Sequence, residues 1–211
     1  MSKVAVIDYD AGNTLSVIKA LEFLGMDVEL TRDADKLRRC ERIIFPGVGA
    51  YFDAMQKLKE YNLTDTVREL ALSDTPFLGI CLGMQLLFDS SEENIGSDVT
   101  DGEIDGLKLL RGNIRLFKGI EPRKIPHMGW NSINVVKSDS RLFKGLPESP
   151  YVYFVHSYYL NAKDRGDVLA TADYGITFDC AIERGNLFGC QFHPEKSGDV
   201  GLDILKNFCE V

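Results

Sequence analysis

The stretch of sequence that decides the fold is FLGICLGMQLLF, residues 77–88. Its first four residues are apolar around one glycine, as in a buried strand, and its last five, Met84 to Phe88, are helix-like. Between them, Gly79 and Gly83 stand two residues either side of Cys81. This spacing is typical of a strand-to-helix turn so sharp that side chains at the flanking positions would collide, and it lifts the central residue clear of the sheet. The stretch therefore predicts an α/β fold with Cys81 at the carboxyl edge of a strand.

The segments around this stretch divide the chain into two kinds of pattern. Before residue 77, short β-branched runs alternate with amphipathic stretches, which is typical of a parallel sheet covered by helices. We expect strands there at Lys3 to Ile7, Asp27 to Leu30 and Arg42 to Phe45, and helices through Val17, Leu21 and Leu24 with Gly25 just past the end, from Tyr51 to Glu60, and from Leu63 to Leu72. After residue 88, short strands follow one another and part of the sheet is expected to be antiparallel, at Ile114 to Phe117, Ser132 to Val136, Tyr151 to Val155, Asp167 to Ala172, Phe178 to Glu183 and Leu187 to Gln191.

The end of the chain predicts a closing helix with Val200, Ile204 and Phe208 on one side and an N-cap at Ser197. No repeat and no linker rich in Pro, Gly or Ser divides the sequence. We therefore expect residues 1–211 to form a single domain with a mixed, mostly parallel sheet, helices on both faces and an antiparallel extension.

Composition excludes several classes of protein. The 24 basic and 32 acidic residues give a net charge of −8 with the acidic residues scattered, which argues against nucleic acid as a partner. The five cysteines are an odd number and form no CxxC pair, which argues against a zinc site and a disulfide framework. Neither a signal sequence nor a membrane-spanning run is expected. We expect a protein of the reducing cytoplasm.

Cys81 is the candidate nucleophile. At the start of a helix the dipole favours its thiolate form, and the backbone N–H of Leu82 points to where an oxyanion would develop. The alternative is a buried structural cysteine, and that interpretation is kept for the other four, Cys40, Cys180, Cys190 and Cys209.

A thiolate nucleophile needs a base that is held in one tautomer, and only three histidines are present. His193 directly follows the expected strand Leu187 to Gln191, and Pro194 biases it toward an extended conformation. Residues i and i+2 of an extended segment point to the same side, so Glu195 can reach the imidazole. The alternative is a histidine at a strand end in an ordinary ion pair.

A second oxyanion donor is expected from another loop at the carboxyl end of a strand. The loop Pro46-Gly47-Val48-Gly49 follows the strand Arg42 to Phe45, and its glycines allow a peptide N–H to turn inward. Taken alone, the same residues are a glycine-rich turn of purely structural importance.

These residues together resemble a known family. GICLGMQ at 79–85 with QFHPE at 191–195 resembles the class I (triad) glutamine amidotransferases. Within them, PGVG at 46–49, PHMGWN at 126–131, FVHSY at 154–158 and EKSG at 195–198 are similar to the glutaminase subunits of imidazole glycerol phosphate synthases, over nearly the whole chain. One departure is DAGN at 10–13, because that turn usually carries another glycine near position 10 in the family.

The resemblance implies a flavodoxin-like sheet, a glutaminase activity and a set of site residues. It implies a catalytic triad of Cys81, His193 and Glu195, and oxyanion donors at Leu82 and, after a peptide flip, at Val48. Glutamine would contact Gly49, Gln85, Glu93, Ser157 and Tyr158. The residues that would face or gate a partner are Asn13, His127, Trp130, Tyr153 and Lys196. It also implies that the partner which receives ammonia is a (βα)8-barrel cyclase subunit, and that the reaction needs no metal or organic cofactor.

Three other functions stay open from the sequence. The chain could deliver ammonia to a different synthase, such as one that modifies a surface sugar. It could be a standalone cysteine hydrolase that acts on γ-glutamyl peptides. It could also be a regulatory or scaffold subunit without activity.

Overall fold

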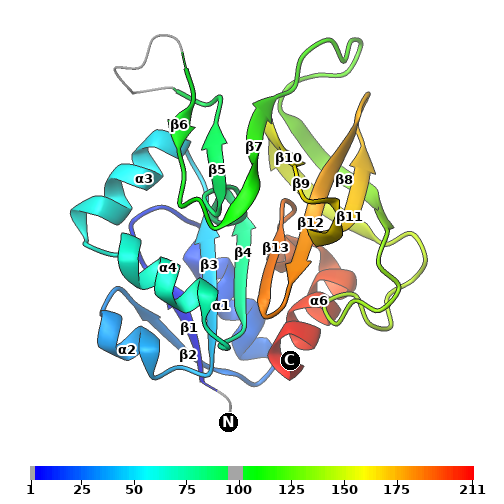
Figure 1. Cartoon of the computed structure of the whole chain (residues 1–211). Helices are drawn as coiled ribbons and strands as arrows, with labels where there is room; N and C mark the ends of the chain where they lie inside the picture. The colour runs from blue at the N-terminus through cyan, green and yellow to red at the C-terminus, as the bar shows by residue number, and fades with distance from the viewer. Residues whose placement is uncertain (1–2, 95–101) are drawn as a thin grey trace.

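The computed structural model describes residues 3–94 and 102–211, and their strands join into one branched sheet (Figure 1). Five parallel strands form its first part: β2 (Asp27–Thr31), β1 (Lys3–Ile7), β3 (Arg42–Gly47), β4 (Phe77–Cys81) and β13 (Leu187–Cys190). The path continues through β12 (Thr177–Arg184), β10 (Tyr158–Ala162), β7 (Leu110–Leu116), β5 (Phe88–Ser91) and β6 (Ile104–Asp105). A branch leaves β12 through β11 (Val168–Asp173), β8 (His127–Val135) and β9 (Tyr151–His156), which pair antiparallel.

Helices cover both faces of the parallel part (Figure 1). One core packs Ile43 and Phe45 of β3 against α2 (Ala34–Arg38), α3 (Tyr51–Glu60) and α4 (Thr64–Leu72). The other packs Ile44 of the same strand against α1 (Thr14–Phe23) and α6 (Gly198–Glu210). Successive side chains of a strand point to opposite faces, so one continuous apolar run supplies both cores.

The turn after β4 brings two elements unusually close together. Cys81 has φ +54°, which is rare for a residue other than glycine, and α5 (Leu82–Gln85) begins directly after it. A Cβ on Gly79 would lie 2.8 Å from the Met84 backbone, and a Cβ on Gly83 would lie 1.8 Å from the carbonyl oxygen of Phe45 in β3. Glycine is therefore required at both positions, as the sequence predicts, because the neighbouring backbone leaves no space for a side chain.

The parallel first half, the partly antiparallel second half and the expected helices before residue 77 and at the end of the chain are confirmed. The helix after Cys81 is shorter than expected, because α5 ends at Gln85 and β5 begins at Phe88. The carbonyl oxygens of Leu86 and Leu87 accept hydrogen bonds from the backbone N–H groups of Leu107, Leu109 and Leu110 instead of continuing a helix. Long-range backbone pairing has thus overridden a helical local pattern.

The sequence did not predict α2, β5, β6, β10 or the 3₁₀ turns η1 (Arg165–Asp167) and η2 (Pro194–Lys196). Two expected strands begin several residues earlier than predicted, at Leu110 in β7 and at His127 in β8. Ser197 occupies the expected N-cap position of α6, but its side chain does not cap the helix. Instead its hydroxyl donates to the carbonyl oxygen of His193 at 2.6 Å and accepts from the N–H of Tyr153 at 3.0 Å. Ser197 therefore fastens the segment after β13 to strand β9.

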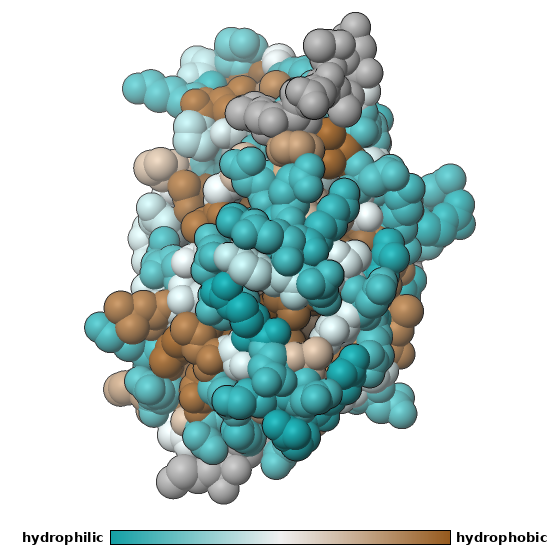
Figure 2. Space-filling view, turned by 90° about the vertical axis from the view of Figure 1, so that its left-hand side faces the viewer, coloured by the Kyte–Doolittle hydropathy of each residue, from teal (hydrophilic) through white to brown (hydrophobic). Residues whose placement is uncertain are grey.

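The surface on the side of α2 and α3 is mainly hydrophilic, and hydrophobic side chains lie there in small groups (Figure 2). Across residues 3–94 and 102–211, no helix has both the length and the apolar character needed to cross a bilayer.

We expect Gly83→Ala to destabilise the protein by roughly 3 kcal/mol or more, because the added methyl group has no space beside the Phe45 carbonyl. Urea unfolding followed by circular dichroism measures the change. Gly166→Ala is the matched control, since a Cβ at Gly166 meets nothing within 4 Å. Equal stability of the two variants would contradict the close packing of α5 on β3.

Candidate active site

A cavity of about 370 Å³ opens at the carboxyl ends of β3 and β4. The residues that line it are Val48, Gly49, Cys81, Leu82, Gln85, Glu93, Pro126, Val155, His156, Ser157 and Tyr158. The structure thus brings together the candidate nucleophile, both candidate oxyanion positions and all five residues that the family resemblance assigns to glutamine. They come from segments that lie far apart in sequence, so the site exists only in the folded chain.

His193 and Glu195 lie behind Cys81, away from solvent. The His193 side chain is 2 % exposed and that of Glu195 is 1 % exposed, and Nδ1 of His193 lies 2.8 Å from Oε1 of Glu195. The contact forms although Glu195 lies in a 3₁₀ turn, η2 (Pro194–Lys196), and not in the extended segment expected from the sequence. Since a carboxylate oxygen can only accept, Nδ1 carries the hydrogen and Nε2 is left for Cys81.

The electrostatics of His193 depend on Cys81 as well as on Glu195. Burial lowers the pKa of His193, but its contacts with the Cys81 and Glu195 side chains raise it more, to about 10. Among the described residues, Nε2 of His193 and Oε2 of Glu195 are buried without a hydrogen-bond partner. A histidine that gains a proton here is stabilised by a thiolate on one side and a carboxylate on the other.

The candidate substrate contacts differ in how firmly they are held. Both hydrogens of the Gln85 amide are used, since Nε2 donates to the carbonyl oxygen of Tyr158 at 3.1 Å and to Oε1 of Gln191 at 2.9 Å. Glu93 is 9 % exposed, and burial raises its pKa. Val48 is 39 % exposed and Gly49 has φ +102°, so the loop after β3 reaches the surface beside the cavity.

His127 does not face outward, contrary to the expectation that it meets a partner. It is 2 % exposed and stacks on Phe154 and Tyr174. Side chains alternate along β8, so His127 and Trp130, three positions apart, lie on opposite faces.

The other candidate interface residues are accessible. Trp130 is 55 % exposed and pairs with half-buried Tyr153 across β8 and β9, and Asn13 and Lys196 are exposed.

His127 and His156 form a buried pair whose proton positions can be derived. Nδ1 of His156 lies 2.8 Å from the carbonyl oxygen of Tyr158 and must carry the hydrogen. Burial lowers the pKa of His156 to about 3, so the ring is neutral and its Nε2 accepts from Nδ1 of His127 at 3.0 Å. Burial also lowers the pKa of His127 to about 4, and its Nε2 accepts from Nδ2 of Asn131 at 3.4 Å.

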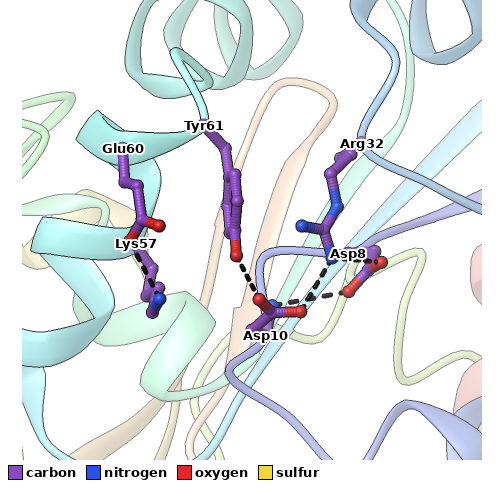
Figure 3. Close-up of polar contacts among 6 residues, drawn as sticks. All are labelled: Asp8, Asp10, Arg32, Lys57, Glu60 and Tyr61. Carbon is purple, nitrogen blue, oxygen red and sulfur yellow. Dashed lines mark hydrogen bonds and ion pairs between the residues drawn. The ribbon is translucent and has the colours of Figure 1, made fainter.

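Asp10, where the family usually has glycine, occupies the backbone conformation that favours glycine, with φ +59°. Figure 3 shows what surrounds it: Nη2 of Arg32 lies 2.7 Å from both Asp10 and Asp8, and the Tyr61 hydroxyl donates to the Asp10 carboxylate. The bonds from Tyr61 and Arg32 hold the pKa of Asp10 below its usual range. Asp10, Val48 and Gly49 border a common surface hollow of about 380 Å³, so this cluster lies beside the oxyanion loop.

Sequence reasoning missed four residues at the site. Pro126, Val155 and His156 line the cavity, and Nε2 of Gln191 donates to the Cys81 sulfur at 3.6 Å. Each belongs to a motif quoted for the family resemblance, but nothing in the local pattern distinguishes a residue beside the sulfur from one in the core.

Comparison with known proteins agrees with the geometry of the site. The family model for "Glutamine amidotransferase class-I" matches residues 5–211. The chain is 48 % identical to the imidazole glycerol phosphate synthase subunit HisH of Moorella thermoacetica, over 100 % of this chain and 96 % of the relative. It is 44 % identical to the subunit of the same name from Methanocaldococcus jannaschii, over 99 % of both chains.

Solved structures share the fold at low sequence identity. The crystal structure of a glutamine amidotransferase superposes with a TM-score of 0.72 at 20 % identity, covering 99 % of this chain and 99 % of that chain. PurLQS from Thermotoga maritima gives a TM-score of 0.75 at 18 % identity, over 99 % and 98 %. The expected flavodoxin-like amidotransferase fold is thus confirmed.

The neutral pair His127 and His156 should make stability depend on pH. Their ordinary pKa is 6.5, and burial lowers it to about 4 and about 3 in the fold. Between these pH values the unfolded chain binds protons that the folded chain does not. The pair therefore makes its full contribution to the free energy of unfolding above about pH 6.5, and the free energy of unfolding decreases as the pH falls toward 4. Urea unfolding at several pH values measures it.

The control is a double variant, His127→Phe with His156→Leu, in which the decrease over this range should be much smaller. His193 affects the comparison little, because its pKa is raised from 6.5 to about 10, so its contribution is constant below about pH 6.5 and decreases only as the pH rises from there. A wild-type protein that is equally stable at pH 4.5 and pH 7 would contradict the neutral pair.

The strained backbone at Asp10 can be separated from its side-chain bonds. Asp10→Gly and Asp10→Ala both remove the carboxylate, but only alanine must adopt φ +59° with a Cβ. We expect the alanine variant to melt about 2–4 °C below the glycine variant, measured by thermal denaturation. Equal melting temperatures would mean that the loop relaxes without the carboxylate.

Proposed function

The chain belongs to the class I glutamine amidotransferase family, and on this basis we propose that it hydrolyses glutamine to glutamate and ammonia as the glutaminase subunit of imidazole glycerol phosphate synthase, in histidine biosynthesis. The observation that carries the proposal is the position of Cys81, which lies in the strand-to-helix turn and lines the cavity, with the buried pair of His193 and Glu195 behind it. We further propose that residues 1–211 form one amidotransferase domain, that the protein acts in the cytoplasm, and that Cys81, His193 and Glu195 are its triad.

In the proposed reaction, the Cys81 thiolate attacks the side-chain amide carbon of glutamine. The raised pKa of His193 keeps its ring protonated at neutral pH while it faces the sulfur. The resulting tetrahedral intermediate expels ammonia with a proton from Nε2 of His193 and leaves a γ-glutamyl thioester. Water activated by the now neutral His193 then releases glutamate and restores the thiolate and the protonated imidazole. Glu195 holds the ring orientation throughout.

The cavity offers polar groups suited to a zwitterionic amino acid. Glu93 is a carboxylate for the α-amino group, while Gly49, Gln85, Ser157 and Tyr158 line the same space. The N–H groups of Leu82 and Val48 would bind the oxyanion. Because Val48 lies in an exposed loop, we propose that its peptide completes the oxyanion hole only when the partner and its ligand are bound, and that the free subunit is nearly inactive.

The proposed partner is the (βα)8-barrel cyclase subunit. Ammonia released into neutral water becomes ammonium, which is not nucleophilic, so it must pass directly to the protein that uses it. The outer face of β8 and β9 supports an interface, since Met128, Trp130 and Tyr151 are 61 %, 55 % and 58 % exposed there. Aromatic residues and methionine are enriched in protein interfaces.

Glutamate release by the wild type and by Cys81→Ala, each with and without the cyclase and its nucleotide ligand, tests this function. We expect full activity only for the wild type with cyclase and ligand, and a loss of about a thousandfold or more in Cys81→Ala. Cys40→Ala removes a buried thiol remote from the cavity and should keep wild-type activity.

Two results would contradict parts of the proposal. Activity that survives in Cys81→Ala would remove the nucleophile, and activity that is indifferent to the cyclase would remove the partner while leaving a glutaminase.

A further inference from the structure

A row of amide groups leads to the Cys81 sulfur. Nε2 of Gln191 lies 3.6 Å from Sγ of Cys81, and Oε1 of Gln191 accepts from Nε2 of Gln85 at 2.9 Å. Gln191 is fully buried, and Gln85 is 4 % exposed. Neither amide can exchange its partners for bulk water, so the direction of these hydrogen bonds has consequences for the sulfur.

The backbone decides that direction. The Tyr158 carbonyl oxygen can only accept, and the Gln85 side-chain atom that lies 3.1 Å from it must therefore be the amide nitrogen. The same nitrogen then donates its second hydrogen to Gln191, which must present its oxygen to Gln85. As a result, Gln191 can only turn its NH₂ group toward Cys81.

The Tyr158 carbonyl oxygen accepts a second hydrogen bond besides the one from Gln85. Nδ1 of His156 donates to it at 2.8 Å, and His156 in turn accepts from His127. Both lone pairs of this oxygen are occupied, so it cannot move to accommodate a reversed Gln85 amide without losing a buried hydrogen bond.

We propose that Gln191 is a positioning residue that holds the Cys81 sulfur by an N–H donor whose direction is fixed from the Tyr158 carbonyl through Gln85. The proposal rests on the role of Cys81 as nucleophile in the proposed function. An N–H group directed at sulfur stabilises the thiolate over the thiol, because the hydrogen bond to the charged acceptor is the stronger one. Gln191 thereby acts on the sulfur together with His193 and adds no charge of its own.

The test is the pH dependence of Cys81 alkylation by iodoacetamide in the complete chain, with the labelled peptide quantified by mass spectrometry. Gln191→Met and Gln191→Leu both remove the donor, and they differ in packing. In both variants the midpoint of the rate profile should move to higher pH by about one unit, so that the rate below the midpoint falls roughly tenfold. A midpoint that is unchanged in either folded variant overturns the proposal.

Asn207→Leu is the matched control. Its amide donates two hydrogen bonds, to the carbonyl oxygens of Leu142 and Lys144, and it does not line the cavity. This variant should lose stability but keep the wild-type midpoint. A shift of the midpoint in Asn207→Leu as large as that in Gln191→Met would mean that general loosening explains the result, and it would overturn the proposal.

A double-mutant cycle tests the fixed direction, and its Gln85→Met variant alone decides the matter if neither Gln191 variant folds. Gln85→Met frees the Gln191 amide to turn, so its midpoint should move in the same direction as that of Gln191→Met, by a smaller amount. The double variant should shift no further than Gln191→Met alone. A wild-type midpoint in Gln85→Met, or additive shifts in the double variant, would contradict the direction of the row.

The result of the alkylation experiment is independent of the glutamate-release assay that tests the proposed function. Alkylation needs neither glutamine nor the cyclase, so an unchanged midpoint would reject the role of Gln191 while Cys81-dependent glutamate release remained. Loss of that dependence would reject the function and leave the alkylation result standing.

Discussion

The contact of Gly83 with the Phe45 carbonyl is the constraint on which the site depends. Any side chain at position 83 would push α5 away from β3, and Cys81 would leave the carboxyl edge of the sheet. The same contact explains why Cys81 adopts φ +54°, since the chain must reverse within one residue to pass from β4 into α5. The strain at the nucleophile is thus maintained by packing on both sides of the turn. The stability of the fold and the position of the Cys81 sulfur therefore both depend on the packing of Gly83 against the Phe45 carbonyl.

The surroundings of Cys81 come from β13 and the turn after it as much as from β4. Strand β13 pairs parallel with β4, with Cys190 opposite Ile80, and this register brings Gln191 and His193 beside the sulfur. Ser197 and the Tyr153 backbone then fix the position of His193, whose N–H donates to Tyr153 at 2.9 Å. Because Tyr153 is also part of the outer face of β9, the base is attached to the strand that carries the proposed partner surface. A displacement of β9 on binding would reach His193 through its N–H bond to the Tyr153 carbonyl oxygen and through the Ser197 hydroxyl, which bonds to both backbones.

Much of the parallel half could be predicted from the sequence, because its strands are continuous apolar runs and the glycines around Cys81 have a single steric explanation. The pairing of His193 with Glu195 was also predictable, because both residues lie in one short segment. The strands β5, β6 and β10 were not, since they form through long-range pairing with partners that local periodicity cannot reveal. His127 was misjudged for a related reason: its burial follows from the start of β8 at residue 127, and the sequence placed that start at Ser132. The role of Gln191 depends on the direction of an amide, which only the Tyr158 carbonyl decides.

The commitment of the Gln85 amide also restricts how this residue can contact glutamine. Both of its hydrogens are donated to protein oxygens, so its carbonyl oxygen is the atom left to bind a ligand, and only as an acceptor. Its partner on the substrate must then be an N–H group, either the side-chain amide or the α-ammonium group. Glutamate, whose side chain carries no N–H group and is charged, would lose this contact at the amide end and would meet the thiolate with an unfavourable charge. Where the Gln85 oxygen accepts from the side-chain amide, the row of amides therefore favours binding of the substrate over the product, while it leaves the reacting carbonyl group to the oxyanion donors.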